Sequence, residues 1–183
     1  MAKGISKVIF GDFPDNASLG IVGFNIIASG DALPASELAD VIYTIRKQTY
    51  PSTKNITILG KFTAENLSGL YTLCQTLKDH NYTIRAVTDG REYFPWFDKV
   101  DYLATVVENK IDWVKFASHQ IIYPLAPEEL KEPTLPPINN LTMLYLDTRN
   151  VDQEQVISFL SGAKHQWNIF RPTKPLIQEE VKV

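Results

Sequence analysis

The chain has 183 residues, of which 44% are hydrophobic and 21% charged, as in ordinary soluble globular proteins. Its 18 Lys and Arg against 21 Asp and Glu give a net charge of −3, which argues against nucleic acid as a partner bound through phosphate contacts. The single cysteine, Cys74, excludes an internal disulfide and a cysteine-rich zinc site. We therefore expect one α/β domain over residues 1–183.

The first residues contain no apolar segment of the kind found in signal peptides. The chain also lacks any run of about 18 apolar residues, the length that a membrane-spanning helix requires. These observations predict a cytoplasmic protein with no membrane partner.

Short apolar runs alternate along the chain with longer amphipathic segments. The expected strands cover 5–10, 21–28, 55–60, 82–88, 100–106, 119–123, 141–146 and 167–171. The expected helices cover 33–48, 64–80 and 151–163, with a short helical turn over 93–99. Asn150 or Asp152 is the expected cap of the last helix. This order predicts a mainly parallel sheet built from strand–helix repeats and curved like a partial (βα) barrel.

Two segments differ from this pattern. Residues 124–140 contain five prolines, at 124, 127, 133, 136 and 137, and we expect a linker or an excursion across the surface there. Residues 174–183 form a polar C-terminal tail in this interpretation.

Several segments resemble a small radical S-adenosylmethionine domain. Residues 19–25 (Leu-Gly-Ile-Val-Gly-Phe-Asn) resemble the lead into the cysteine loop of that family. Residues 55–63 take the place of its next strand and of the Gly-Gly-Glu-Pro turn, and Thr88-Asp89-Gly90 resembles the turn that follows. The most similar kinds are the anaerobic ribonucleotide reductase activating proteins and the 7-carboxy-7-deazaguanine synthases. The resemblance covers roughly residues 18–125 and implies a partial barrel.

The resemblance also implies a [4Fe–4S] cluster held by three thiolates of a CxxxCxxC motif, and this chain departs from that motif. No cysteine lies between Gly20 and Ala39, and of Gly-Gly-Glu-Pro only Gly60 remains. Lys61 follows it, where the family holds the amino group of its cofactor, and a lysine would repel that ammonium group. The chain thus resembles a degenerate member, for which radical chemistry is excluded and neither a cofactor nor a catalytic residue is expected.

Polar residues follow several of the expected strands, where α/β sheets carry their binding sites. This strand-end rim comprises Ser29, Asp31, Gly60, Lys61, Thr88, Asp89, Arg91, Asp147 and Arg149. Such a mixture of charges is typical of a site for a small anion or a nucleotide. The alternative is that these residues serve as turn formers and helix caps, which the same positions also require.

The remaining chemistry-bearing residues give no site of their own. His80, His119 and His165 lack the spacing of a metal motif, so no metal site is expected. Cys74 falls on the apolar side of the helix over 64–80, which indicates a buried structural thiol. A dense aromatic group belongs either to the core or to a protein interface, and consists of Tyr93, Phe94, Trp96, Phe97, Trp113 and Phe116.

Three hypotheses about function follow. The first is a non-catalytic interaction or regulatory protein, on a radical-SAM-like scaffold, that binds a protein partner or itself, in a phage or mobile-element setting. The second is a small-anion or nucleotide-binding protein, or an enzyme, that uses the strand-end rim. The third is a virion or assembly component whose 124–140 segment and polar tail make subunit contacts.

Overall fold

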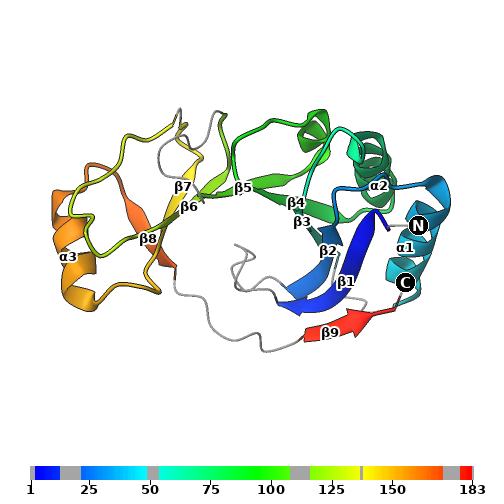
Figure 1. The fold of residues 1–183 in the computed structure, drawn as a ribbon, viewed down its shortest axis with the longest axis horizontal. Coiled ribbons are helices and arrows are strands. Elements are labelled where there is room, and N and C mark those ends of the chain that lie inside the picture. The colour runs from blue at the N-terminus through cyan, green and yellow to red at the C-terminus, as the bar shows by residue number, and fades with distance from the viewer. Residues whose placement is uncertain are drawn as a thin grey trace.

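The computed structural model describes residues 3–12, 22–48, 54–107, 116–136, 138–170 and 178–182. Over these ranges the chain forms one nine-stranded sheet, three α-helices and a short 3-10 helix, η2 (Pro95–Lys99) (Figure 1). The α-helices are α1 (Ala35–Lys47), α2 (Leu67–Asp79) and α3 (Gln153–Gly162). The strands are β1 (Ile5–Asp12), β2 (Val22–Ala28), β3 (Asn55–Gly60), β4 (Thr83–Thr88), β5 (Tyr102–Val106), β6 (Gln120–Pro124), β7 (Met143–Asp147), β8 (Trp167–Phe170) and β9 (Gln178–Val181).

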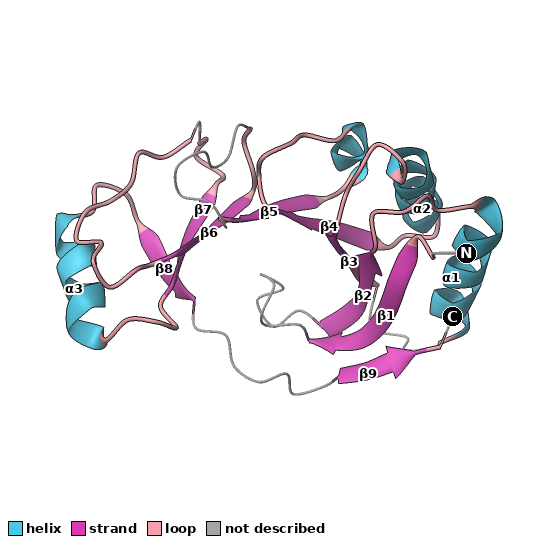
Figure 2. Cartoon of the chain, in the orientation of Figure 1, coloured by secondary structure: helices cyan, strands magenta, loops and turns pink. Residues whose placement is uncertain are grey.

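The sheet is mostly parallel. Strands β2 to β8 lie side by side in chain order, and each runs parallel to the next. β1 pairs antiparallel with β2, and β9 pairs antiparallel with β1, which gives the order β8-β7-β6-β5-β4-β3-β2-β1-β9 (Figure 2). The prediction of a mainly parallel α/β sheet is therefore confirmed.

Regular strand–helix repeats are not confirmed. In the described chain, α-helices connect β2 to β3, β3 to β4 and β7 to β8, whereas β4 leads into η2 and residues 125–136 and 138–142 contain no helix. Prolines explain this difference, because proline lacks the N–H group that helical hydrogen bonding needs. The curved sheet is also no closed barrel, since β8 and β9 form its two edges.

Part of the polar tail is a strand that the sequence analysis missed. β9 pairs with β1 through Val8 and Val181, and Val181 is buried in the main core. The segment holds two glutamates and a single buried apolar residue, so its hydrophobic pattern is too weak to predict a strand.

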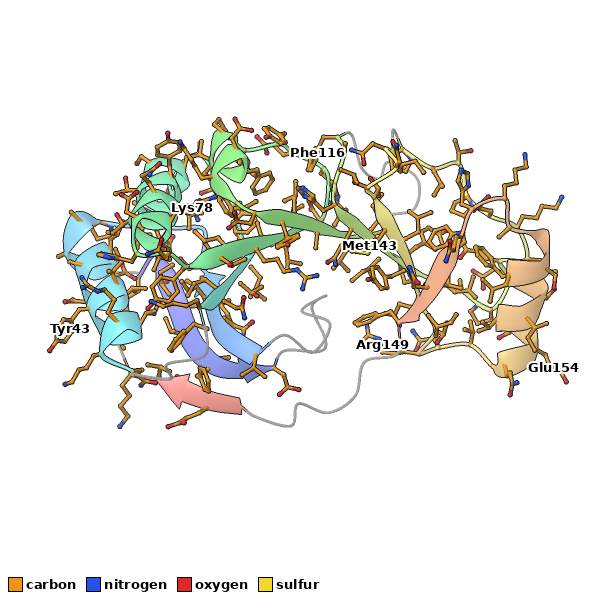
Figure 3. All side chains as sticks on the ribbon, turned by 180° about the vertical axis from the view of Figure 1, so that it is seen from behind. Tyr43, Lys78, Phe116, Met143, Arg149 and Glu154 are labelled. Atoms are coloured by element: carbon orange, nitrogen blue, oxygen red, sulfur yellow. The ribbon has the colours of Figure 1, made fainter. Side chains whose placement is uncertain are left out.

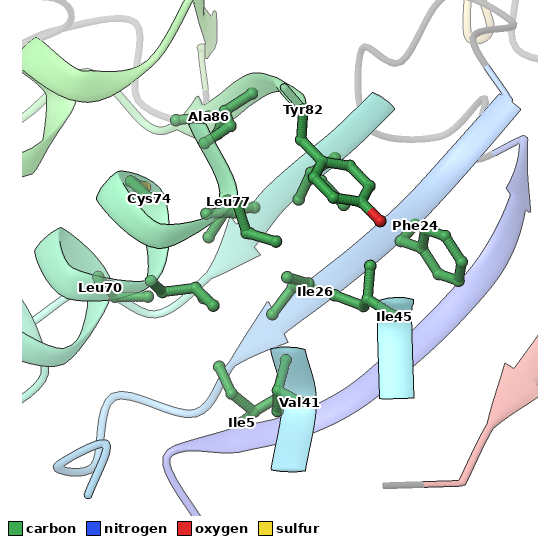
Figure 4. Close-up of a cluster of buried hydrophobic side chains, with 14 of the residues drawn as sticks. Ile5, Phe24, Ile26, Val41, Ile45, Leu70, Cys74, Leu77, Tyr82 and Ala86 are labelled. Atoms are coloured by element: carbon green, nitrogen blue, oxygen red, sulfur yellow. The ribbon is translucent and has the colours of Figure 1, made fainter. Parts of the chain in front are cut away.

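All three α-helices cover one face of the sheet, which we call the outer face. Even-numbered residues of β2, β3 and β4, such as Phe24, Ile58 and Ile84, pack with α1 and α2 in the largest core cluster (Figure 4). The strand register places Ile121 and Leu144 on this same face, where they pack with Phe159 of α3. The opposite, inner face is therefore free of α-helices in the described chain.

Local hydrogen bonds set the ends of these elements. The Glu37 carboxylate of α1 accepts bonds from the N–H groups of Gly4 (3.0 Å) and Ile5 (2.8 Å), which ties the helix to β1. Asp152 caps α3 in a reciprocal box with Gln155, as expected from the sequence. None of the helices in the described ranges is long and apolar enough to cross a membrane.

Candidate ligand site at the carboxyl edge of the sheet

A cleft of about 530 Å³ lies beyond the carboxyl ends of β3, β4 and β5, and we call it the carboxyl-edge cleft. Apolar groups of Leu59, Val87, Phe94 and Val106 line part of it. The remaining lining residues come from the turns after β3 and β4, and are Gly60, Lys61, Phe62, Thr88, Asp89, Arg91 and Glu92. Five of the nine predicted rim residues are thus brought together in one cleft.

The turn after β3 is held in a fixed conformation. Gly60 has φ +106°, and a Cβ atom at this position would lie 2.4 Å from the carbonyl oxygen of Ala28. Only glycine fits there without strain. The buried Asn66 side chain closes the turn, because it accepts from the Thr63 N–H (3.1 Å) and donates to the Lys61 carbonyl (3.0 Å). The sequence analysis did not identify Asn66. Its position just before α2, where turn-forming residues are common, was the one sequence signal for such a role.

Lys61 supplies the unneutralised positive charge of the cleft. Its side chain is exposed, and no ion pair with another described residue engages its ammonium group. Its aliphatic stem lies over Gly30, where an added Cβ would come within 2.8 Å of the Lys61 Cδ atom. Gly30 therefore leaves the space that the lysine stem needs to reach the cleft.

The turn after β4 carries the remaining charges. Asp89 accepts from the backbone N–H of Arg91 (3.1 Å), and its carboxylate lies 3.6 Å from the Arg91 Nε atom. Thr88 is buried and accepts from the Gly90 N–H (3.2 Å), so it acts as a turn residue. Asp89 offsets the charge of Arg91, and Glu92 adds a second carboxylate to the lining. Lys61 is the cation of the cleft that no ion pair with a described residue engages, and it is therefore the group that could attract an anion.

The other four predicted rim residues lie outside this cleft. Ser29 Oγ accepts from the Asp31 N–H (3.0 Å) and lies 2.7 Å from the Lys3 carbonyl oxygen, so both residues close the turn after β2. Asp147 and Arg149 form an ion pair at the end of β7, with Nη2 and Oδ2 2.7 Å apart. Figure 3 shows Arg149 in the half of the molecule that carries α3, away from α1 and α2. The rim expected from the sequence is thus divided: the Ser29–Asp31 turn adjoins the cleft through Gly30, whereas Asp147 and Arg149 form a distant group.

The residues present do not fit the iron–sulfur cluster that the family resemblance implies. The turn after β2 offers hydroxyl and carboxylate groups engaged in hydrogen bonds, and no thiol. Cys74 lies on α2, fully buried in the outer core (Figure 4), and burial raises the pKa of its thiol to about 12. Among the described residues, no group of three or more His, Cys, Asp or Glu side chains could hold a metal ion.

The aromatic group is mainly core, as the packing alternative predicts. Phe94, Trp96 and Phe97 are buried and meet Phe62 edge-on, with ring centroids 4.9 to 6.1 Å apart. Tyr93 is 46% exposed, and the predicted member Trp113 lies outside the described residues. The cluster supports the wall of the cleft through Phe62 and Phe94, which belong to both.

No family model matches the chain, and no curated protein matches it. The functional argument therefore rests on the geometry and chemistry of the cleft.

Proposed function

We propose that the protein binds a small anionic ligand with an apolar or aromatic body, such as a nucleotide, in the carboxyl-edge cleft, and that it carries out no radical chemistry. The observation that carries this proposal is the Lys61 ammonium, which forms no ion pair with a described residue and lies beside a cleft with a partly apolar lining. A volume of about 530 Å³ lies within the range typical of small-molecule sites.

The distribution of groups suits such a ligand. Leu59, Val87 and Val106 offer an apolar surface to a ring system, while Lys61 offers a cation to a phosphate or carboxylate. The carboxylates of Asp89 and Glu92 accept hydrogen bonds from hydroxyl groups, as acidic residues at strand ends do for the ribose of a dinucleotide. The cleft thus has a place for each part of a nucleotide.

The proposal includes the resemblance to radical S-adenosylmethionine domains, now as the origin of the scaffold. The chain order of the parallel strands β2 to β8 and the curvature of the sheet support it. The segment that resembles the Gly-Gly-Glu-Pro turn lies in the cleft at Gly60, Lys61 and Phe62. Because Lys61 repels an ammonium group and attracts a phosphate, the replacement favours an anion over S-adenosylmethionine.

A thermal-shift screen with adenosine monophosphate, adenosine diphosphate, inorganic phosphate and S-adenosylmethionine tests this proposal. We expect a nucleotide at a hundred times its Kd to add about 2.7 kcal/mol to the free energy of unfolding, which raises Tm by about 5–10 °C. S-adenosylmethionine should give the smaller shift. If no compound raises Tm, the proposal fails.

Variants at Lys61 locate the effect. Lys61→Ala should weaken nucleotide binding about 10- to 150-fold, because one charge-assisted hydrogen bond is lost. Lys61→Arg should retain most of the nucleotide affinity. Lys131→Ala, at an exposed lysine of the 124–140 segment, should bind the nucleotide with the affinity of the native protein. An equal loss in the Lys61→Ala and Lys131→Ala variants would place the ligand elsewhere.

The second candidate function is the non-catalytic interaction protein. Exposed apolar residues at the α3–β8 end of the sheet favour it, namely Ile157 (54% exposed), Leu160 (37%) and Ile169 (50%). Sedimentation of the native protein and of Ile157→Asp tests self-association through this end. A concentration-dependent oligomer that the substitution abolishes is the expected result, whereas a monomer at all concentrations speaks against self-association.

A further inference from the structure

A buried arginine on the inner face of the sheet uses few of its hydrogen-bond donors within the described chain. Arg85 of β4 is only 5% exposed. Its Nη2 atom donates to the Gln120 side-chain oxygen, but Nε and Nη1 have no hydrogen-bond partner among the residues that the structure describes. A guanidinium carries five N–H groups, so this one bond leaves most of its capacity unused.

Arg85 lies in the wall of a small cavity whose surface is mainly apolar and whose lining includes Ile56. The register of β3, β4 and β5 places Thr57 and Tyr102 on either side of Arg85. These residues, with Asn55, Thr83 and Gln120, line a cavity of about 90 Å³. None of the described carboxylates forms an ion pair with Arg85. Burial lowers the pKa of the Arg85 guanidinium to about 10, so the group remains a cation at neutral pH.

A buried cation without a counter-charge is costly, and folded proteins leave few buried polar groups unpaired. Hydrophobic packing alone would favour an apolar residue at position 85, as at Val87 two residues later. The retained guanidinium is accounted for if an anion from outside the chain completes its hydrogen bonds.

We propose that Arg85 is the anchor of a second binding site, which takes the carboxylate group of a small organic acid. The planar fork of a guanidinium matches a carboxylate with two parallel hydrogen bonds. A cavity of about 90 Å³ equals the liquid volume of about three water molecules, which suits a carboxylate with a few carbon atoms. The hydroxyl groups of Thr57 and Thr83 are further polar contacts in the same cavity.

This site is separate from the carboxyl-edge cleft, because the two share no lining residue. The inference is therefore independent of the proposed function. Either site can fail its test while the other stands.

Nuclear magnetic resonance of the arginine Nε–H groups tests the proposal on the native chain. The protein has five arginines, Arg46, Arg85, Arg91, Arg149 and Arg171, so the spectrum is simple. Sodium acetate is the probe, sodium phosphate is the competing oxyanion, and sodium chloride at equal ionic strength is the control. We expect acetate to shift the Arg85 signal along a saturable curve, while the exposed Arg46 signal stays in place.

Three results would overturn the proposal: no movement of the Arg85 signal with acetate, equal movement with chloride, or movement with phosphate alone. The Arg85→Gln variant assigns the signal.

If that variant does not fold, Gln120→Glu provides a second test, because it places a carboxylate beside the guanidinium within the chain. Gln120→Glu should raise Tm without ligand and weaken acetate binding at least about tenfold, whereas Gln120→Asn should do neither. A Gln120→Glu protein that binds acetate as the native chain does would also contradict the proposal.

Discussion

Replacing Glu132 with alanine should weaken the attachment of the proline-rich 124–140 segment to the α3–β8 end of the sheet. The Glu132 side chain is 8% exposed. Its carboxylate accepts hydrogen bonds from the Trp167 indole (2.7 Å), from the backbone N–H groups of Lys164 (3.0 Å) and His165 (3.2 Å), and lies 3.0 Å from His165 Nδ1. Glu132 is therefore the main polar attachment of the segment, beside the hydrogen bond from Gln155 to the Pro127 carbonyl (2.9 Å) and the packing of Leu135 and Ile138 against the α3–β8 core.

The expected loss follows from these contacts. A hydrogen bond to a charged group contributes about 1.5–3 kcal/mol, but water can replace the carboxylate at the exposed residues 164 and 165. The buried Trp167 indole loses its partner outright. We expect Glu132→Ala to lower the free energy of unfolding by about 2–4 kcal/mol, as measured by urea denaturation. Glu128→Ala, at an exposed glutamate of the same segment, should change it by no more than about 0.5 kcal/mol.

The same carboxylate gives a pH dependence of known sign. Burial alone would raise the pKa of Glu132, but hydrogen bonds from Trp167, Lys164 and His165 outweigh burial and hold it below its usual value. A lowered folded-state pKa stabilises the protein above the unfolded pKa of about 4.3, and the contribution is lost as pH falls through the folded value. Glu132→Gln should remove this part of the acid sensitivity. Equal stabilities of Glu132→Ala and Glu128→Ala, or an unchanged acid profile in Glu132→Gln, would refute the reasoning.

Three further predictions concern the core and the cleft. The Cys74 thiol, whose pKa burial raises to about 12, should react with a thiol reagent only after unfolding, and rapid labelling of the native protein would contradict its burial. Trp96→Ala should lower the free energy of unfolding by about 3–5 kcal/mol, against no more than about 1 kcal/mol for Tyr43→Ala, which is 65% exposed; similar losses would contradict the buried cluster. Gly60→Ala should lower the free energy of unfolding by about 1–3 kcal/mol, because Gly60 has a φ of +106°. Gly162→Ala, where an added Cβ would meet its nearest neighbour at 3.9 Å, should not lower it in this way. An unchanged free energy of unfolding in Gly60→Ala would contradict the strained turn.

The elements with strong hydrophobic periodicity could be predicted from the sequence. The expected strand at 55–60 and the expected helices at 33–48 and 64–80 agree with β3, α1 and α2 within a few residues. β9 could not be predicted, because its stability comes from pairing with β1 rather than from its own apolar pattern. The absence of a helix between β6 and β7 in the described chain has a different cause, because prolines in the 124–140 segment interrupt helix formation.

The candidate site was predictable only in part. Residues at the ends of β3 and β4 meet in the cleft because these strands are neighbours. Asp147 ends β7, which lies three strands from β4 and thus about 14 Å away at the usual strand spacing. The sequence cannot give strand order, so it could not separate these groups. Arg85 was missed for a related reason: an arginine in a short strand indicates a solvated face, and only the packing of the inner face shows that it is buried.

A titration of the isotopically labelled protein with adenosine monophosphate, followed by backbone amide signals, tests the proposed ligand site most directly. The account predicts saturable shifts at Gly60, Lys61, Asp89 and Gly90, which lie in or beside the cleft, and none in α3. Shifts confined to residues outside the cleft, or none at all, would contradict it.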